Sequence, residues 1–198
     1  MIIVVAALKG GVGKTTTAVY LAAVAVGARR PTTLVDADPQ ASAADWLEVG
    51  EDEVFEQISL VEAPTDRLLL KTLDRVDHDG VAVVDTPPGH ERVLAKAIER
   101  ASAVVIPTRV GGVETPRVEA VLDMVPSKTP VGLVICSART YTRDYSEMVD
   151  AWREANVPVW GTVSERVAIA SGPQNWLAPD GIDAYRGVWR RITREVRV

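Results

Sequence analysis

The chain has 198 residues and a mass of 21.3 kDa, which is about the size of one domain and long enough to bury a hydrophobic core. Hydrophobic residues make up 47% and charged residues 25%, a balance that excludes a disordered chain, and no apolar run reaches the roughly 18 residues of a membrane span. The net charge of −5 argues against a protein that binds nucleic acid through a globally basic surface.

The N-terminal apolar run lacks a basic n-region and leads directly into a glycine-rich loop, so it is interpreted as a strand and not as a signal peptide. We therefore expect a cytoplasmic protein with no room for an N-terminal helix-turn-helix. The single cysteine, Cys136, is interpreted as a buried strand residue. One cysteine per chain cannot form an internal disulfide, a four-thiolate zinc site or an iron–sulfur cluster, so redox chemistry is not expected.

Apolar, β-branched runs alternate along the chain with stretches of helical periodicity. Strands are predicted at 2–6, 32–36, 57–61, 81–85, 103–107, 131–136 and 157–163. Helices are predicted at 15–27, 41–49, 65–76, 91–100, 114–125, 144–155 and 182–197. Because the strand runs are almost continuously apolar, both faces of the sheet should be covered, as in a parallel sheet. The sequence predicts one doubly wound α/β domain over 1–198, with its ligand site beyond the carboxyl ends of the strands.

A glycine-rich loop follows the first strand and opens the first helix, which is the context of a phosphate-binding loop. Its backbone N–H groups and the helix N-terminus favour phosphate oxygens. Lys14 supplies a positive charge to the β- and γ-phosphates, and the hydroxyl of Thr15 is placed to bind Mg²⁺. The predicted nucleotide-binding residues are Lys9, Gly10, Gly11, Val12, Gly13, Lys14, Thr15 and Thr16. A glycine-rich turn with a chance lysine is the alternative.

This loop departs from the general pattern, because Leu8 stands where a glycine is expected and Lys9 is an additional lysine. The string from Lys9 to Thr16 resembles the deviant Walker A motif of the ParA/MinD family of ATPases. The resemblance implies that Lys9 reaches the phosphates of a partner subunit's nucleotide, so that ATP holds a homodimer together. A second cation at the γ-phosphate would neutralise charge that develops during phosphoryl transfer. A merely solvated Lys9 is the alternative.

Two aspartates, Asp36 and Asp38, end the second strand just before a helix. Taken alone they are typical of a turn with a helix cap. The segment resembles switch I of ParA-type proteins, and the Trp46 that follows is similar to the short, ParF-like partition members. By this resemblance Asp36 supports the hydration shell of Mg²⁺ and Asp38 orients the attacking water, which makes Lys9, Lys14 and Asp38 the candidate catalytic residues.

The run 81–85 is an apolar strand that ends in Asp85, the Walker B arrangement, and Thr86-Pro87-Pro88 resembles the family's switch II. Asp85 is expected to bind Mg²⁺ through water, together with Thr15 and Asp36. An ordinary aspartate at a strand end is the alternative. Since no strong general base is evident, hydrolysis without a partner should be slow.

Many relatives carry an asparagine near the end of the strand at 131–136 for adenine recognition, whereas this chain has Cys136 and Ser137 there. The residues that contact adenine are therefore not assigned. The preference for ATP over GTP follows from the family resemblance.

The C-terminal segment 183–198 has five arginines against two acids, and its apolar residues recur at helical spacing. The predicted DNA-binding residues form a second stripe: Arg186, Arg190, Arg194 and Arg197. Non-specific contact with DNA phosphates is one interpretation, since ParA-type proteins bind DNA in this way when ATP-bound. A solvated helix face with no binding role is the alternative. Binding to a membrane surface, as in MinD, is the least favoured interpretation.

Segment 48–79 is acidic, with ten acids against three bases. It is interpreted as a solvated surface or as the landing site of a basic, ParB-like adaptor that stimulates hydrolysis. The resemblance implies a Mg²⁺-dependent, nucleoid-associated ATPase that segregates plasmid or chromosomal DNA. The alternatives are an ATPase that positions a protein cargo such as a carboxysome and a MinD-like, membrane-associated division-site regulator. Two rival classes are weaker: a metabolic enzyme on this scaffold lacks an insertion for a substrate pocket, and a nitrogenase-reductase-like carrier lacks cluster cysteines.

Overall fold

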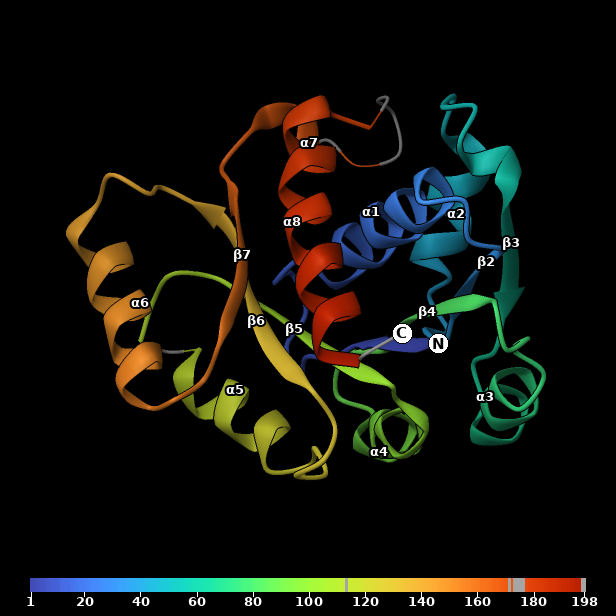
Figure 1. The fold of residues 1–198 in the computed structure, drawn as a ribbon, viewed down its shortest axis with the longest axis horizontal. Coiled ribbons are helices and arrows are strands. Elements are labelled where there is room, and N and C mark those ends of the chain that lie inside the picture. Colours follow the sequence, from blue (N-terminus) through green and yellow to red (C-terminus); the bar gives the residue numbers. More distant parts are fainter. Residues whose placement is uncertain (113, 171, 173–176, 197–198) are drawn as a thin grey trace.

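A computed structural model describes residues 1–198 except 113, 171, 173–176 and 197–198. Its centre is a seven-stranded, wholly parallel sheet in the order β3-β2-β4-β1-β5-β6-β7 (Figure 1). The strands are β1 (Ile2–Val5), β2 (Thr32–Asp36), β3 (Ile58–Glu62), β4 (Val81–Asp85), β5 (Ala103–Thr108), β6 (Val131–Ala138) and β7 (Val159–Ser164). The prediction of a doubly wound α/β fold is confirmed, and every predicted strand is present.

The helices are α1 (Lys14–Gly27), α2 (Ser42–Val49), α3 (Asp66–Leu73), α4 (Glu91–Arg100), α5 (Thr115–Leu122), α6 (Arg143–Glu154), α7 (Val167–Ala170) and α8 (Pro179–Val196), with a 3₁₀ turn, η1 (Phe55–Gln57). The seven predicted helices are present. The sequence did not predict η1 or α7, which are too short for a helical period to emerge. Helix α8 begins earlier than predicted, at Pro179, a residue suited to the first turn of a helix.

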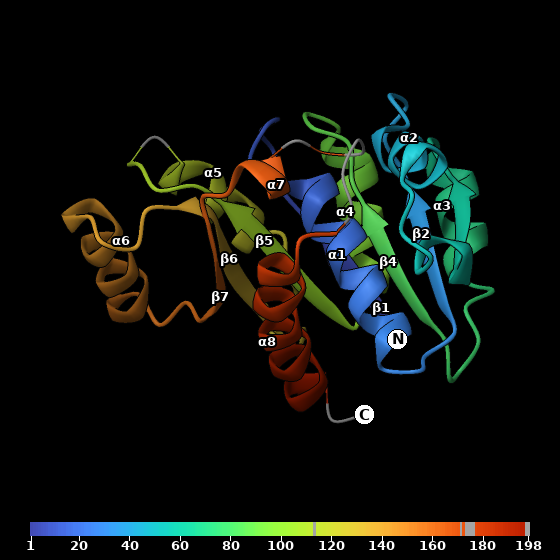
Figure 2. The same cartoon turned by 90° about the horizontal axis from the view of Figure 1, so that it is seen from above.

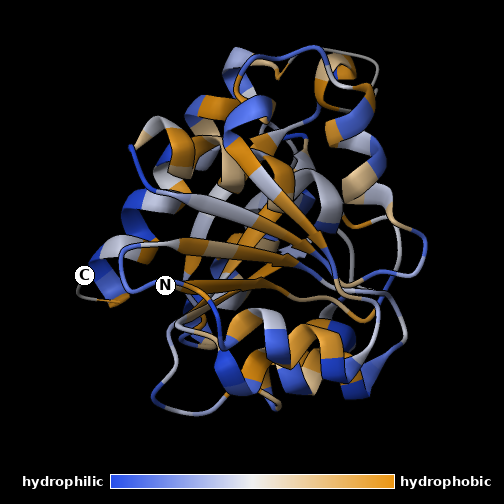
Figure 3. Cartoon of the chain, turned by 90° about the vertical axis from the view of Figure 1, so that its right-hand side faces the viewer, coloured by the Kyte–Doolittle hydropathy of each residue, from blue (hydrophilic) through white to orange (hydrophobic). Residues whose placement is uncertain are grey.

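Two hydrophobic cores lie on opposite faces of the sheet. Helices α1, α2 and α8 cover one face, where Tyr20 stacks on Tyr185 with ring centroids 5.3 Å apart and meets Trp46 edge to face. Helices α3, α4, α5 and α6 cover the other face, with Trp152 of α6 at its margin. Figure 2 shows α1 and α8 together on their face, and Figure 3 shows the apolar strands between the two helical layers.

Close packing at Gly181 sets the position of α8 against α1. A Cβ atom there would lie 2.5 Å from the ring of Tyr20, so only glycine permits this approach. Gly187, farther along the same helix, faces open space. Within the described ranges, no helix is both long and apolar enough to cross a membrane.

Candidate functional site

The loop between β1 and α1 has the backbone geometry of an anion cradle. Gly13, the residue before α1, has φ 99° and Gly11 has φ 75°, which are left-handed conformations that favour glycine. No side chain caps the start of α1. The first N–H groups of a helix have no partner within the helix, and the helix dipole makes this end positive. The loop therefore offers N–H donors where a phosphate group would lie.

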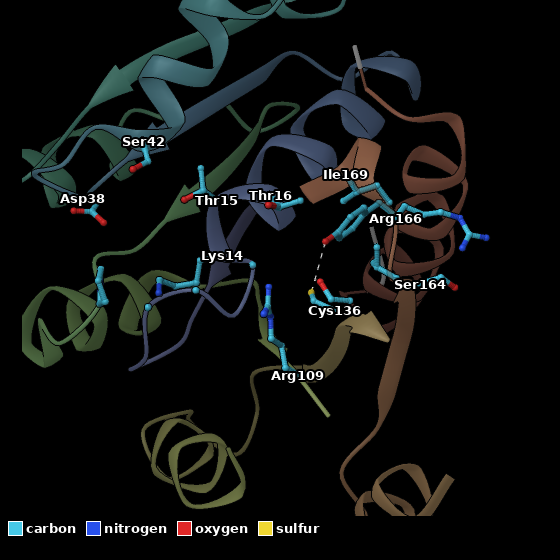
Figure 4. Close-up of a pocket in the computed structure, with 17 residues that line it drawn as sticks. Lys14, Thr15, Thr16, Asp38, Ser42, Arg109, Cys136, Ser164, Arg166 and Ile169 are labelled. Carbon is cyan, nitrogen blue, oxygen red and sulfur yellow. Dashed lines mark hydrogen bonds between the residues drawn. The ribbon is translucent and has the colours of Figure 1, made fainter. Parts of the chain in front are cut away.

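A cavity of about 370 Å³ opens at this loop, beyond the carboxyl ends of the strands. Asp38 and Ser42 lie on one side of the phosphate loop in Figure 4, and Cys136, Ser164 and Ile169 lie on the other. Of the predicted nucleotide-binding residues, those that line the cavity are Gly10, Gly11, Gly13, Lys14, Thr15 and Thr16. Lys9 and Val12 do not line it.

Thr15 and Asp85 form the centre of the candidate Mg²⁺ site. The hydroxyl of Thr15 donates to Oδ2 of Asp85 at 2.7 Å, while Oδ1 of Asp85 is buried and has no hydrogen-bond partner among the described residues. Burial raises the pKa of Asp85 to about 7; the bond from Thr15 opposes this shift and the nearby Asp36 adds to it. A buried, partnerless carboxylate oxygen beside a hydroxyl fits a divalent cation, because oxygen ligands suit Mg²⁺ and its charge favours the ionised carboxylate.

Asp36 is fully buried next to Asp85 in the β2–β4 ladder, and its carboxylate has structural partners. Its Oδ2 accepts from the N–H groups of Ala43 and Ala44 at 2.9 and 3.0 Å, and Oδ1 accepts from the N–H of Asp38 at 3.0 Å. Burial raises the pKa of Asp36, and these three N–H donors oppose the shift. Asp36 thus acts as an N-terminal cap of α2 and does not line the cavity. A role toward Mg²⁺ hydration stays a prediction.

Asp38 is partly buried and lines the cavity. Its Oδ1 accepts from the N–H of Gln40 at 2.9 Å, which fixes the turn before α2. Because Asp38 lines the cavity, its carboxylate is in a position to orient a water molecule there.

The two lysines of the loop lie in different places. Lys14 is buried, and its ammonium donates to the backbone oxygen of Lys9 at 2.7 Å. Burial lowers the pKa of Lys14, and the negative charges of Asp85 and Asp38 oppose this shift. The side chain of Lys9 is 44% exposed and forms an ion pair with Glu114, whose side chain is 10% exposed. Lys9 therefore points away from the cavity, toward the start of α5.

The sequence analysis did not predict several of the residues that line the cavity, because they come from the C-terminal half of the chain. Arg109, just after β5, extends toward the phosphate loop (Figure 4). Its place at a strand's carboxyl end was the signal that could have identified it. Tyr185 of α8 also lines the cavity, and its hydroxyl lies 2.8 Å from that of Thr17 in α1. Cys136 lies below Gly13 and is buried, as predicted; burial raises the pKa of its thiol.

The arginines of α8 are exposed on the side away from the sheet. Arg186 pairs with Asp183 at 2.7 Å and Arg194 with Glu195 at 3.0 Å. Arg190 makes no ion pair with the described residues. Arg191, which is not in the predicted stripe, is also exposed and makes no ion pair with a described residue. Arg197 lies outside the described residues.

A parallel sheet with a glycine-rich loop between its central strand and α1, and with carboxylates at neighbouring strand ends, defines a P-loop nucleotide-binding protein. The family model of the CobQ/CobB/MinD/ParA nucleotide binding domain matches residues 3–177, and the chain belongs to this family. The family prediction drawn from the deviant loop is thereby confirmed. Membership of the ParF-like subgroup stays a prediction.

Relatives resemble part of the chain, among them the following two. Protein ParA of Rhizobium radiobacter is 38% identical over 109 residues, which are 54% of this chain and 48% of that protein. Maintenance of carboxysome distribution protein A of Gloeobacter kilaueensis is 45% identical over 101 residues, which are 50% of this chain and 45% of that protein. The chain thus spans about half the length of the curated relatives it matches.

Solved structures share the fold over nearly the whole chain. One is described as a plasmid partition protein of Borrelia burgdorferi bound to AMPPNP, with a TM-score of 0.80, 21% identity and 98% coverage of both chains. Another is the septum site-determining protein MinD of Pyrococcus horikoshii with Mg-ADP, with a TM-score of 0.78, 18% identity, and coverage of 97% of this chain and 95% of that one. At these identities the likeness shows a common fold.

Proposed function

We propose that this chain is a ParA-type ATPase that dimerises with ATP, binds DNA non-specifically as a dimer, and leaves DNA after partner-stimulated hydrolysis. The observation that carries this proposal is the position of Lys9. It belongs to the phosphate loop, yet it lies outside the cavity of its own protomer and is half exposed. A lysine in this position is available to the nucleotide of a second protomer, provided that it leaves Glu114.

Within one protomer, Lys14 and the loop N–H groups hold the β- and γ-phosphates. Thr15 and Asp85 would hold Mg²⁺, and Asp36 would support its hydration shell; the bound ion would neutralise phosphate charge. Asp38 orients the attacking water, and Arg109 adds a positive charge on the phosphate side of the cavity. These side chains act by position and charge, so basal hydrolysis should be slow until a partner completes the site.

For DNA, we propose that the arginines of α8 contact backbone phosphates without reading bases. Arg190 and Arg191 support this role because both are exposed and make no ion pair within the described ranges. A two-fold dimer doubles these contacts, so binding should weaken steeply with salt. The apolar side of α8 packs against α1 and β7, which leaves little apolar surface for a membrane.

Two kinds of cargo fit this cycle. The ParA relative and the similar partition structure favour plasmid or chromosomal DNA. The similarity to a carboxysome distribution protein favours a protein compartment as the second candidate. Both would use the same switch, with a nucleoid-associated ATPase in the cytoplasm and a ParB-like or other adaptor on the cargo.

The dimer is tested by light scattering after gel filtration, with ATP, ADP or no nucleotide. We expect a dimer with ATP only. Lys9→Gln should abolish the dimer and keep nucleotide binding, because the loop N–H groups and Lys14 remain. Lys71→Gln, an exposed lysine on α3, is the matched control and should behave as the unmodified protein. An ATP-bound dimer of Lys9→Gln with unchanged affinity would contradict the proposed role of Lys9.

DNA binding is tested by mobility shift with non-specific duplex DNA in the same nucleotide states, beside anionic liposomes. We expect ATP-dependent, salt-sensitive binding to DNA. Arg190→Glu with Arg194→Glu should abolish it and leave the ATP-bound dimer intact. Arg67→Glu on α3 with Arg75→Glu, two residues after the end of α3, makes the same charge change and should leave DNA binding intact. Binding to liposomes without binding to DNA would instead assign α8 to a membrane surface.

A further inference from the structure

We infer that one end of the nucleotide cavity contacts a purine base through the hydroxyls of Ser137 and Ser164, and that the site therefore accepts ATP and GTP with similar affinity. This end is called the β6–β7 end; it is lined by Cys136, Ser137, Val163, Ser164 and Ile169. The inference rests on the proposed function, because it takes the phosphate loop to hold a nucleoside triphosphate. It departs from the preference for ATP over GTP that the family resemblance implies.

The phosphate loop separates the β6–β7 end from the rest of the cavity. Asp38 and Ser42 lie on one side of the loop, and Cys136 and Ser164 lie on the other (Figure 4). Burial raises the pKa of Asp85 and the charge of Asp38 adds to this shift, so Asp38 is near the candidate Mg²⁺ site. The terminal phosphates of a nucleotide therefore belong on the side of Asp38. The base is left with the β6–β7 end.

The β6–β7 end combines apolar walls with two hydroxyls that have no partner. Val163 and Ile169 line it and are buried, so a flat ring finds apolar contact there. The two hydroxyls come from neighbouring strand ends, because Ala138, which follows Ser137, pairs with Ser164. Neither hydroxyl forms a hydrogen bond with a described residue. Both are thus available to the polar edge of a ring that the apolar walls cover.

The backbone at Ser137 is a second indication of a ligand contact. Its φ is 50°, in the left-handed region, and the β6–β7 ladder is irregular between Ile135 and Ala138. Few residues other than glycine adopt this conformation, and asparagine and aspartate do so most readily. Residues held in this region cluster at ligand sites. Aspartate can therefore replace Ser137 without added backbone strain.

The chemistry of a hydroxyl sets the specificity. A serine hydroxyl donates or accepts and rotates to suit its partner. Adenine presents an amino donor where guanine presents a carbonyl acceptor, and a hydroxyl pairs with either. Of the described residues that line the cavity, the one carboxylate is Asp38, on the phosphate side, and none has a side-chain amide. The guanidinium of Arg166 already binds Asp180 and the backbone oxygen of Glu165, each at 3.2 Å.

Isothermal titration calorimetry of the full chain with Mg²⁺ and the non-hydrolysable analogues AMPPNP and GMPPNP measures the two affinities. We expect dissociation constants within about tenfold of each other, whereas a site with fixed, complementary partners discriminates by about 10⁴-fold. Inorganic tripolyphosphate measures the contribution of the phosphate loop alone. It should bind more weakly than either analogue, because it has no ring to contact Val163 and Ile169.

Variants with a fixed acceptor test the two hydroxyls. Ser137→Asp should shift the ratio of the two affinities by about tenfold or more toward GMPPNP, because guanine offers N–H donors to a carboxylate and adenine offers an acceptor at N1. Ser164→Asp should shift it in the same direction. Ser42→Asp, the matched control on the phosphate side, should weaken both analogues alike and leave their ratio within about twofold.

Two results would overturn the inference and leave the proposed function standing. One is a preference of the unmodified protein for either analogue of more than about tenfold. The other is a ratio in Ser137→Asp and Ser164→Asp equal to that in Ser42→Asp. Binding of neither analogue to the unmodified protein would overturn the proposed function together with the inference.

Discussion

Replacing Glu114 by glutamine tests whether this carboxylate holds Lys9 back from a second protomer. Water reaches the ion pair from the side of Lys9, which is 44% exposed, but hardly from that of Glu114, which is 10% exposed. In its exposure the pair is intermediate between a surface ion pair and a buried charged hydrogen bond. A free energy of about 1 kcal/mol is therefore a fair value for the Lys9–Glu114 pair. A two-fold dimer must break the pair twice, which costs about 2 kcal/mol, or roughly 30-fold in the dissociation constant.

We therefore expect Glu114→Gln to lower the dissociation constant of the ATP-bound dimer by roughly 30-fold. Sedimentation equilibrium over a series of protein concentrations, with a non-hydrolysable ATP analogue, measures this constant. Glu119→Gln is the matched control, since Glu119 lies on α5, the helix that Glu114 precedes, is exposed and forms no ion pair with Lys9. A dissociation constant that is unchanged or higher in Glu114→Gln would refute the reasoning, because Glu114 would then support the dimer as much as it opposes it.

Three further predictions concern the fold. Because the pKa of Asp85 is raised from 3.8 to about 7, protonation of its carboxyl stabilises the folded protein. This stabilisation is complete below about pH 4 and is lost as the pH rises to about 7. Asp85→Asn should remove this loss, and denaturant midpoints at pH 4.5 and 8 measure the difference between variant and unmodified protein. Gly181→Ala should lower the free energy of unfolding by roughly 1–3 kcal/mol, whereas Gly187→Ala on the same helix should raise it by up to about 1 kcal/mol; chemical denaturation measures both. Tyr185→Phe, which deprives Thr17 of its 2.8 Å partner, should cost about 1–2 kcal/mol and lower Tm by roughly 2–4 °C per kcal/mol in a thermal melt. The first prediction is contradicted if stability changes with pH equally in Asp85→Asn and in the unmodified protein. The second is contradicted if Gly181→Ala does not lower the free energy of unfolding, and the third if Tyr185→Phe leaves Tm unchanged.

The fold could be predicted from the sequence because its signals are local. Buried parallel strands need continuous apolar runs, and covering helices need an apolar stripe, so both leave a period in the sequence. The boundaries of α3, α5 and α8 were less accurate, since helix ends depend on capping and on neighbouring elements. Short elements such as η1 and α7 carry too few residues for a period.

The candidate site was predictable where its chemistry lies in one segment. The phosphate loop, Thr15 and Asp85 are local motifs at strand ends, and the parallel sheet brings such ends together. The capping role of Asp36 is the alternative that its position before a helix indicated, and it is confirmed. Which N–H groups it caps was not predictable, because they become its neighbours only when α2 folds back on β2. Arg109 was missed because its only signal in the sequence is its place just after β5, which it shares with every residue that follows a strand.

The sequence by itself determined the succession of strands and helices along the chain, the family and the loop that would bind phosphate. Each of these depends on residues that are neighbours along the chain. Only the tertiary structure decided which groups the charged and polar side chains contact. Lys9 meets Glu114 across 105 positions of sequence, and Tyr185 meets Thr17 across 168. Contacts of this kind depend on how the sheet orders its strands, and local periodicity carries no information about that order.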